Sequence, residues 1–406
     1  MVEGYAAHKP STRGDLEQVY ALMRAVFPNE GVDGIIERLL DNYPATTLDH
    51  IFTVRHGGET VAALIMIPQT WVMGGVELRV AEMGCVATRP DHRGRGLQRA
   101  LNGAFDAYAA LHGFDLCALA GIPFFYRQFG YEYAVDLDHR TTLDADGIPD
   151  YEGLVARPFT DGDLDTASAM LEEAQSRYHV SCPRTREVWL MQHRTGYYNG
   201  EPFKAVALVE GGEMKAYARV SVDAPNGVLV LKEAGMASQA YARPVLAYLK
   251  EACREQGLAR VRSQQFYGDE PTKTMIELGG VASTPYAWQV KVLDHLGLFR
   301  NLSPLLESRL RASGYGGLTE NLALNFRRFS VALTVEEGRI TGVERSLDCS
   351  DRTIGLNPYV FPQLLLGHRG VRELEAAYPD LRIRDSHRPI LEAMFPRGPG
   401  YIFHVY

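Results

Sequence analysis

The spacing of apolar residues predicts a helix and a β-hairpin near the start of the chain. Apolar side chains recur three and four positions apart over residues 16–27, which is typical of an amphipathic helix that ends at Pro28. Residues 61–73 and 76–87 are rich in apolar and β-branched side chains, and they flank Gly74-Gly75, a dipeptide typical of hairpin turns. The pattern therefore predicts two long antiparallel strands.

The same alternation continues beyond the hairpin. The second strand runs into a loop with two glycines, and the loop leads into a long helix with an apolar face, residues 97–112. A short strand follows at residues 114–119, and then a helix-like turn that ends at Gly130. These elements predict a mixed α/β (α+β) unit.

A faint internal repeat indicates that this unit occurs twice. The segment Pro10–Leu16 (PSTRGDL) recurs as Pro158–Leu164 (PFTDGDL), 148 positions later. Residues 97–119 have an echo of helix, glycine and strand in residues 241–263, at a shift of 144 positions. Two echoes in the same order at nearly the same shift favour two copies of one domain. The alternative is that P-x-T-x-G-D-L is only a common way to begin a helix.

The last third of the chain has a different pattern. Residues 329–335 and 339–343 flank Glu337-Gly338 and predict another hairpin. Residues 357–366 are an apolar helix candidate. Residues 401–406 are apolar and β-prone to the last position, and since chain ends normally fray into water, we expect this end to be packed.

Composition and charge narrow the class of protein. The 406 residues are 46% hydrophobic and 23% charged, with a net charge of -8, so the chain lacks the basic field that favours nucleic acid or anionic lipid. The five cysteines form no C-x-x-C pair, and no apolar run approaches the ~20 residues needed to cross a bilayer. No signal-peptide core is visible at the N-terminus. We expect a reduced, cytoplasmic protein without a disulfide framework, a metal site or a membrane segment.

The clearest chemical signal is the stretch Met83–Gln98. A strand ends there, and a turn that contains Arg93, Gly94, Arg95 and Gly96 leads straight into a helix. The first turn of a helix offers unpaired N–H groups and a partial positive charge, and glycines let the backbone approach a phosphate closely. The stretch is neither a Walker loop nor a dinucleotide fingerprint. A phosphate cradle and a solvated basic turn both remain open on this pattern alone.

This stretch resembles the acetyl-CoA motif of the GNAT superfamily of N-acetyltransferases, [QR]-x-x-G-x-[GA] after a strand. Arg93–Leu97 fits the motif, whereas Gln98 stands where the family has a small residue. The resemblance implies that Cys85, Val86, Ala87, Arg93, Gly94, Arg95, Gly96, Leu97 and Gln98 bind acetyl-CoA. The corresponding segment of the second copy, Ser238–Val245, has no glycine pair, so we expect one cofactor site per chain.

A second segment, Phe124–Tyr131, resembles the F-Y-x-x-x-G-[FY] signature of the same superfamily. In that family the tyrosine that matches Tyr126 directs its hydroxyl at the sulfur of CoA. A phenol of pKa about 10 can protonate a departing thiolate, whose acid has a pKa of about 8.5. The alternative is that Tyr126 is an ordinary packed aromatic residue.

Over its full length the chain resembles the Eis (enhanced intracellular survival) acetyltransferases. That resemblance implies tandem GNAT folds followed by a sterol-carrier-protein-like α+β domain: a catalytic domain at 1–152, a second GNAT-like domain without the cofactor motif at 153–285, and the third domain at 286–406. In that family the free carboxylate of a C-terminal aromatic residue is the catalytic base. The implied catalytic pair is Tyr126 as acid and the α-carboxylate of Tyr406 as base.

The pKa values limit how directly that base can act. An α-carboxyl group has a pKa of about 3.5 and a lysine-like amine about 10.4, so direct proton transfer is uphill by roughly 9–10 kcal/mol. We therefore expect the Tyr406 carboxylate to orient the ammonium and to work through water. Glu82, on the strand before the loop, is the alternative base, because other GNAT branches place a catalytic Glu there; it could also be a surface carboxylate.

The remaining groups near the loop have minor expected roles. Backbone N–H groups of Cys85–Ala87 would polarise the thioester carbonyl. A covalent acetyl-Cys85 is disfavoured, because no histidine is placed in the sequence to activate it. His92 is expected to be structural.

The expected function is transfer of acetyl from acetyl-CoA, in a ternary complex and without metal, to a primary amine of a small molecule, such as an aminoglycoside or polyamine, or of a lysine. Glu30, Asp33 and Glu37 could hold a cationic acceptor or could be solvated loop carboxylates, and Val405 adds no charge. The alternative function is a lipid-binding protein with a relic acetyltransferase domain. The family resemblance implies a homohexamer built from trimers, or alternatively a trimer.

Overall fold

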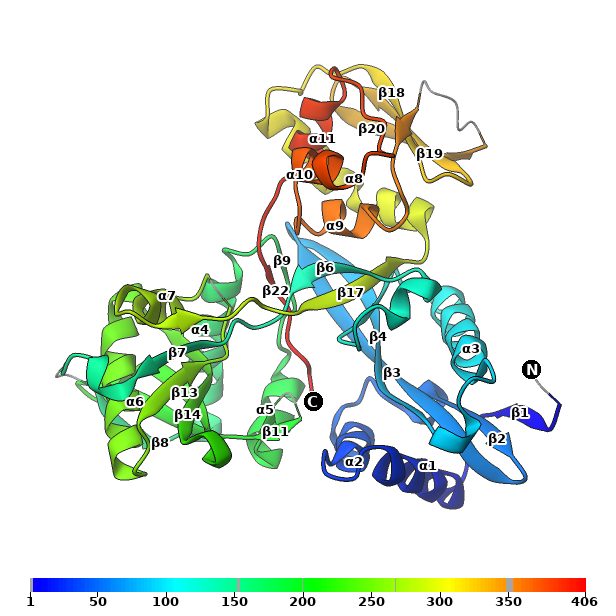
Figure 1. Ribbon diagram of the computed structural model, residues 1–406. Coiled ribbons are helices and arrows are strands. Elements are labelled where there is room, and N and C mark those ends of the chain that lie inside the picture. Colours follow the sequence, from blue (N-terminus) through cyan, green and yellow to red (C-terminus); the bar gives the residue numbers. More distant parts are fainter. Residues whose placement is uncertain (1–2, 152–153, 199, 267, 348–352) are drawn as a thin grey trace. The chain divides into compact units, whose positions relative to one another are not determined.

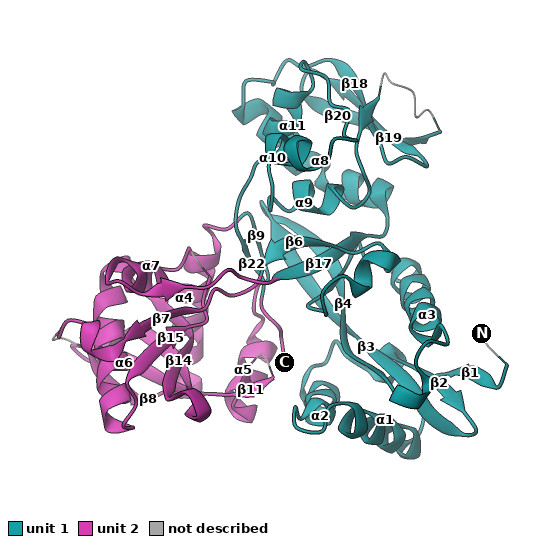
Figure 2. Cartoon of the chain, viewed as in Figure 1, with its two compact units in different colours: residues 1–136, 179–182, 287–402 teal, residues 137–178, 183–286, 403–406 magenta. Residues whose placement is uncertain are grey.

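The computed structural model describes residues 3–151, 154–198, 200–266, 268–347 and 353–406. The chain forms two compact units, coloured separately in Figure 2. Unit 1 contains residues 1–136, 179–182 and 287–402, and unit 2 contains residues 137–178, 183–286 and 403–406. The domain boundary expected at residues 152–153 and one cysteine, Cys349, lie outside the described residues.

A large sheet forms the centre of unit 1 (Figure 1). Its strand order is β1 (Tyr5–His8), β2 (Ile51–His56), β3 (Glu59–Met73), β4 (Val76–Thr88), β5 (Leu116–Leu119), β17 (Ala287–Val292) and β6 (Glu132–Asp136). Two short strands extend it: β9 (Val180–Ser181) pairs with β3, and β22 (Gly400–Tyr401) pairs with β9. Strands β4 and β5 run parallel, and most other neighbours are antiparallel.

Helices cover both faces of this sheet. Helices α1 (Arg13–Val26) and α2 (Val32–Asn42) pack together, and α1 lies against β3 and β4. Helix α3 (Leu97–Leu111) shares a core with Ala62, Leu64 and Met66 of β3. Successive side chains of a strand point to opposite faces. The buried residues of β3 that alternate with Ala62, Leu64 and Met66 along the strand therefore face away from α3. The predicted hairpin is confirmed, since Gly74 and Gly75 have positive φ between the antiparallel β3 and β4.

The C-terminal part of unit 1 begins with α8 (His295–Ala312) and has a small sheet in the order β20 (Arg339–Ser346), β19 (Ser330–Glu336), β18 (Glu320–Asn325) and β21 (Ile354–Gly355). The predicted hairpin at Glu337-Gly338 is confirmed by the antiparallel pairing of β19 and β20. Three short helices follow: α9 (Phe361–Leu365), α10 (Val371–Ala377) and α11 (Arg388–Met394). The helix expected over residues 357–366 is wrong at its start, because Asn357 forms a turn and Pro362 lies in the first turn of the helix.

Unit 2 has a second sheet, in the order β16 (Val281–Ala282), β7 (Thr141–Asp144), β15 (Arg260–Ser263), β14 (Val228–Met236), β13 (Glu213–Asp223), β12 (Lys204–Glu210) and β8 (Val155–Pro158). Its helices are α4 (Leu164–Gln175), α5 (Arg186–Thr195), α6 (Ala242–Glu255) and α7 (Glu270–Glu277). Strands β10 (Tyr197–Tyr198) and β11 (Glu201–Pro202) pair separately.

The two sheets share one topology, as the repeat predicts. In each, three antiparallel strands are followed by a helix and a strand parallel to the third: β2–β3–β4, α3 and β5 in unit 1, and β12–β13–β14, α6 and β15 in unit 2. The next strand comes from a distant segment in both units. Strand β17 fills that place beside β5, and β7 fills it beside β15. The expected mixed α/β fold is confirmed.

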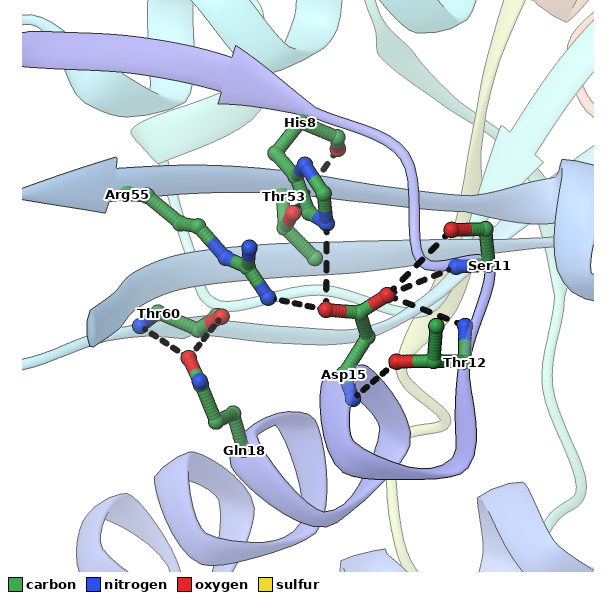
Figure 3. Close-up of polar contacts among 8 residues, drawn as sticks. All are labelled: His8, Ser11, Thr12, Asp15, Gln18, Thr53, Arg55 and Thr60. Atoms are coloured by element: carbon green, nitrogen blue, oxygen red, sulfur yellow. Dashed lines mark hydrogen bonds and ion pairs between the residues drawn. The ribbon is translucent and has the colours of Figure 1, made fainter. Parts of the chain in front are cut away.

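The repeated P-x-T-x-G-D-L segment forms the same helix cap in both units. Thr12 and Asp15 bond reciprocally at the start of α1, and Thr160 and Asp163 do so at the short turn before α4. In unit 1 the Asp15 carboxylate also accepts from the Ser11 N–H at 2.9 Å and pairs with Arg55 of β2, while His8 Nε2 lies 3.3 Å away (Figure 3). These contacts, the Ser11 N–H foremost, hold the pKa of Asp15 far below its usual range.

Replacing Asp15 therefore weakens unit 1 in a pH-dependent way. A carboxyl with a depressed folded pKa stabilises above its unfolded pKa, about 3.9, and loses that contribution as the pH falls. We expect Asp15→Asn to lower the melting temperature at pH 7 by about 2–4 °C, the size of a lost helix cap, and the deficit to shrink below about pH 4. Melting curves between pH 7 and pH 3.5 measure it. The control is Glu17→Gln, an exposed residue of the same helix, and a deficit independent of pH would contradict the assignment.

Candidate active site

A bulge in β4 opens the backbone at the centre of the unit 1 sheet. Ala63 pairs with Ala87 and Ile65 with Gly84, so β4 holds one more residue than β3 between these pairs, and Cys85 has φ 49°. On its other side β4 pairs with β5 only as far as Glu82 and Ala118, although it continues to Thr88. The strand segment after Glu82 is therefore not hydrogen-bonded to β5, which leaves its backbone available to a ligand.

The loop after β4 ends at the open N-terminus of α3. Gly94 and Gly96 have φ 74° and 72°, and no described atom lies within 4 Å of where a Cβ would stand on either. The cap residue, Gly96, supplies no side-chain acceptor, so the first N–H groups of α3 remain open. Arg93 and Arg95 are both exposed beside them. Open N–H groups, a helix dipole and two guanidinium groups fit a pyrophosphate.

Gln98 ties this loop to the end of β4. Its Nε2 donates to the Ala87 carbonyl at 3.0 Å and to Thr88 Oγ1 at 2.9 Å. A small residue could not make these bonds, so the departure from the family motif has a structural role. The Gln98 Oε1 atom is buried, and no hydrogen-bond partner for it lies within the described residues.

Tyr126 lies in the same core as the strand and the helix. It sits in the short turn Phe125–Phe129, is 6% exposed, and shares one hydrophobic cluster with Met83, Leu97 and Leu119. A Cβ on Gly121 would stand 2.3 Å from the ring of Tyr126, so only glycine admits the ring. Burial raises the pKa of Tyr126 to about 12. The phenol is therefore protonated at neutral pH, as a general acid must be.

Glu82 is a buried carboxylate, and the expectation of a surface strand residue is wrong. It is 1% exposed and accepts a hydrogen bond from Gln69 Nε2, and the Gln69 Oε1 accepts from Trp71 Nε1 at 2.8 Å. Tyr43 is also buried close by; burial, then Cys182 and Glu82, raise its pKa. Gln69 was not among the residues expected at the site, although a glutamine inside the apolar run 61–73 is the signal that marks it.

The other residues near the loop are held by structural contacts. His92 is buried, and its Nδ1 shares a hydrogen bond of 2.9 Å with the hydroxyl of Tyr5 in β1, which agrees with a structural role. Burial, and to a lesser degree Glu82, raise the pKa of the Cys85 thiol to about 12. Within the described residues no group of three or more His, Cys, Asp or Glu side chains could hold a metal ion. In the same part of the chain, no helix has the length and apolar character that a membrane span requires.

The C-terminal residue, Tyr406, belongs to unit 2. The apolar end of the chain is packed, as expected, since Phe403 and Val405 are each 4% exposed. Although residues 401–406 are β-prone, β22 ends at Tyr401. Beyond it, the Val405 carbonyl accepts a hydrogen bond from Gln192, and the main-chain oxygen of Tyr406 accepts one from the Gly200 N–H.

Comparisons with known proteins agree with this architecture. Residues 7–134 match the family model of the acetyltransferase (GNAT) domain. A search of curated proteins gave no match. Among solved structures, a probable N-acyltransferase from Enterococcus faecalis is 15% identical with a TM-score of 0.76, over 99% of this chain and 100% of that one. A GCN5-related N-acetyltransferase from Anabaena variabilis is 14% identical with a TM-score of 0.74, over 98% and 99%.

Eis1 from Mycobacterium abscessus is also similar in fold, with 14% identity and a TM-score of 0.65 over 98% of this chain and 99% of that one. At such identities the likeness is one of fold. The recognition of a GNAT acetyltransferase domain is confirmed, and a likeness over nearly the whole of Eis1 is consistent with the Eis-like resemblance.

The raised pKa of Cys85 predicts an inert thiol. With a pKa of about 12, its thiolate fraction at pH 8 is about a thousandfold below that of an ordinary cysteine. We expect alkylation of Cys85 by iodoacetamide at pH 8 to be slower than in the unfolded chain by about that factor, as followed by peptide mass spectrometry. The Cys85→Ser variant identifies the peptide. Labelling as fast in the folded chain as in urea would contradict the raised pKa of Cys85 and would favour a mechanism with a covalent acetyl-Cys85.

Proposed function

Residues 7–134 are a GNAT acetyltransferase domain, and on that premise we propose that this chain is an acetyl-CoA-dependent N-acetyltransferase. The acceptor is a primary amine of a small molecule or of a lysine side chain. The observation that carries the proposal is the open N-terminus of α3 behind Gly94 and Gly96, next to the stretch of β4 that does not pair with β5.

The loop supplies the binding energy for the cofactor. The N–H groups of Gly94–Leu97 would bind the pyrophosphate, and Arg93 and Arg95 would add positive charge. Gln98 keeps the loop fixed against Ala87 and Thr88, so these donors are pre-organised. Val86 packs against the core that holds Tyr126, which brings the bulged strand and the phenol to one side of the sheet.

The chemistry is a direct transfer in a ternary complex. The amine lone pair attacks the thioester carbonyl carbon, and the N–H groups of Cys85–Ala87 bind the oxyanion that forms. The C–S bond then breaks, and the Tyr126 hydroxyl gives its proton to the departing thiolate. The proton lost by the amine goes to a base.

We assign the base to the α-carboxylate of Tyr406, acting through water and by orienting the ammonium. Direct proton transfer to a carboxylate of ordinary pKa is uphill by roughly 9–10 kcal/mol, which favours the relay. Glu82 is the second candidate. Its Gln69 contact holds it in the sheet interior, so it needs water to reach an acceptor as well.

An acidic face on α1 and α2 supports a cationic acceptor. Burial, and then the negative charges of Glu37, Asp41, Glu17 and Asp33, raise the pKa of Tyr20, so these carboxylates lie within electrostatic range of its hydroxyl. Asp33 and Glu37 lie in helix α2 and not in a loop, and Asp33 pairs with Arg24 at 2.9 Å. Since Asp33 is paired, the negative charge that attracts an ammonium group by long-range steering comes from Glu17, Glu37 and Asp41. In the same proposal the enzyme is cytoplasmic and forms a homohexamer.

Removing the Tyr126 hydroxyl tests the acid. We expect Tyr126→Phe to lower kcat about 10²–10³-fold, the usual worth of a general acid, with the KM for acetyl-CoA within about twofold. Free CoA release with a panel of amines measures both constants. Tyr131→Phe is the matched control, since that ring is buried 6.2 Å from Tyr126. An unchanged kcat in Tyr126→Phe would remove the phenol from the mechanism.

Moving the terminal carboxylate tests the base. One glycine added after Tyr406 displaces the carboxylate by about 3.8 Å, and we expect turnover to fall at least about 100-fold while acetyl-CoA still binds. Glu82→Gln is expected to retain turnover within a few fold. The opposite result, a collapse in Glu82→Gln and no effect of the extension, would make Glu82 the base.

A further inference from the structure

A chain of buried polar side chains in unit 2 ends on the C-terminal residues. Arg184 binds Glu233 through two hydrogen bonds of 2.8 and 2.6 Å, and Arg219 Nε lies 3.6 Å from the same carboxylate. Arg219 Nη1 donates to Gln192 Oε1 at 2.6 Å. Gln192 Nε2 in turn donates to the Val405 carbonyl at 3.1 Å. All four side chains are buried, and Gln192 is 0% exposed.

The last residues of the chain meet this network at further points. The guanidinium of Arg184 lies 4.4 Å from the ring centroid of Phe403, and the ring of Tyr198 is 6.2 Å from the same centroid. The Gly200 N–H donates to the main-chain oxygen of Tyr406 at 3.1 Å. Phe403, Val405 and Tyr406 thus each have a hydrogen bond or a cation–π contact in unit 2.

The network carries more positive than negative charge. Arg184 and Arg219 share one carboxylate, Glu233, so these three side chains together carry one more positive than negative charge. Aromatic rings stabilise part of this positive charge, since the Arg219 guanidinium lies 4.4 Å from the ring centroid of Trp189 and 4.8 Å from that of Phe203.

A buried charged network of this kind is an inefficient way to increase the free energy of unfolding. Buried charges lose hydration, and well-packed apolar residues often stabilise a core as much or more. What polar groups add is one defined geometry, because each hydrogen bond fixes direction as well as distance. Here that geometry is passed through Gln192 to the backbone of Val405, the residue before the one that bears the terminal carboxylate.

We propose that Arg184, Gln192, Arg219 and Glu233 are positioning residues that hold the C-terminal carboxylate of Tyr406 in one orientation for proton transfer. The proposal rests on the proposed function, in which that carboxylate is the base. It also gives the second copy of the fold a role in catalysis, because a unit that lacks the glycine cradle supports the base instead of binding a second cofactor.

Gln192→Glu separates positioning from stability. The new side chain still accepts from Arg219 but cannot donate to the Val405 carbonyl, and it places a carboxylate oxygen against that carbonyl. We expect kcat to fall about 10–100-fold, the cost of a misplacement near 1 Å, with the KM for acetyl-CoA within about twofold. The matched control is Gln265→Glu, a glutamine also buried in unit 2 whose Nε2 donates to the Ala234 carbonyl. It is expected to keep its kcat at temperatures below its melting point.

The outcomes separate this proposal from the proposed function. If Gln192→Glu and Gln265→Glu have the same kcat while the glycine extension after Tyr406 abolishes turnover, the assignment of the Tyr406 carboxylate as base is supported and the positioning role is contradicted. If the extension has no effect, the proposed base falls, and with it this proposal. Should Gln192→Glu fail to fold, Phe403→Leu removes the contact with Arg184 and carries the same expectation: a lower kcat at unchanged acetyl-CoA KM. An unchanged kcat in Phe403→Leu then overturns it.

Discussion

The pairing of β4 is the constraint on which the rest of unit 1 depends. This strand pairs with β3 at both of its ends, with a bulge at Cys85 that turns its backbone, but it pairs with β5 only from Val80 to Glu82. One side of a central strand is therefore left without a sheet partner next to the N-terminus of α3. The features assigned to the cofactor lie at this opening: the backbone without a β5 partner, the glycine loop after the strand, and Tyr126 packed into the same core.

Comparison of the two copies shows how the scaffold and the site can separate. Both units keep the threonine–aspartate cap and the parallel pair of strands, β4 with β5 and β14 with β15. The loop differs. In unit 2 the Ser238 hydroxyl accepts from the Ala240 N–H, and Pro244 removes an N–H from the first turn of α6. These changes use up or delete N–H donors of the kind that α3 leaves open.

The sequence patterns predicted those turns and helices that depend on residues close together in the chain. The Gly74-Gly75 and Glu337-Gly338 turns and the helix after Gly96 follow from residues within a few positions of one another, and the structure confirms them. Contacts between distant segments were not predictable in this way. Gln69 reaches Glu82 only because the register of the hairpin brings them together, and Arg184 meets Glu233 across 49 positions. Strands β7 and β17 join their sheets from far along the chain for the same reason.

Amide hydrogen exchange with and without acetyl-CoA tests the central claim most directly, because it reads the backbone groups on which the account depends. If the opening in β4 and the cradle before α3 hold the cofactor, acetyl-CoA slows exchange at Cys85–Ala87 and Gly94–Leu97, and leaves the corresponding loop of unit 2, Gln239–Val245, unchanged. Exchange at Cys85–Ala87 and Gly94–Leu97 that does not respond to saturating acetyl-CoA would contradict the account.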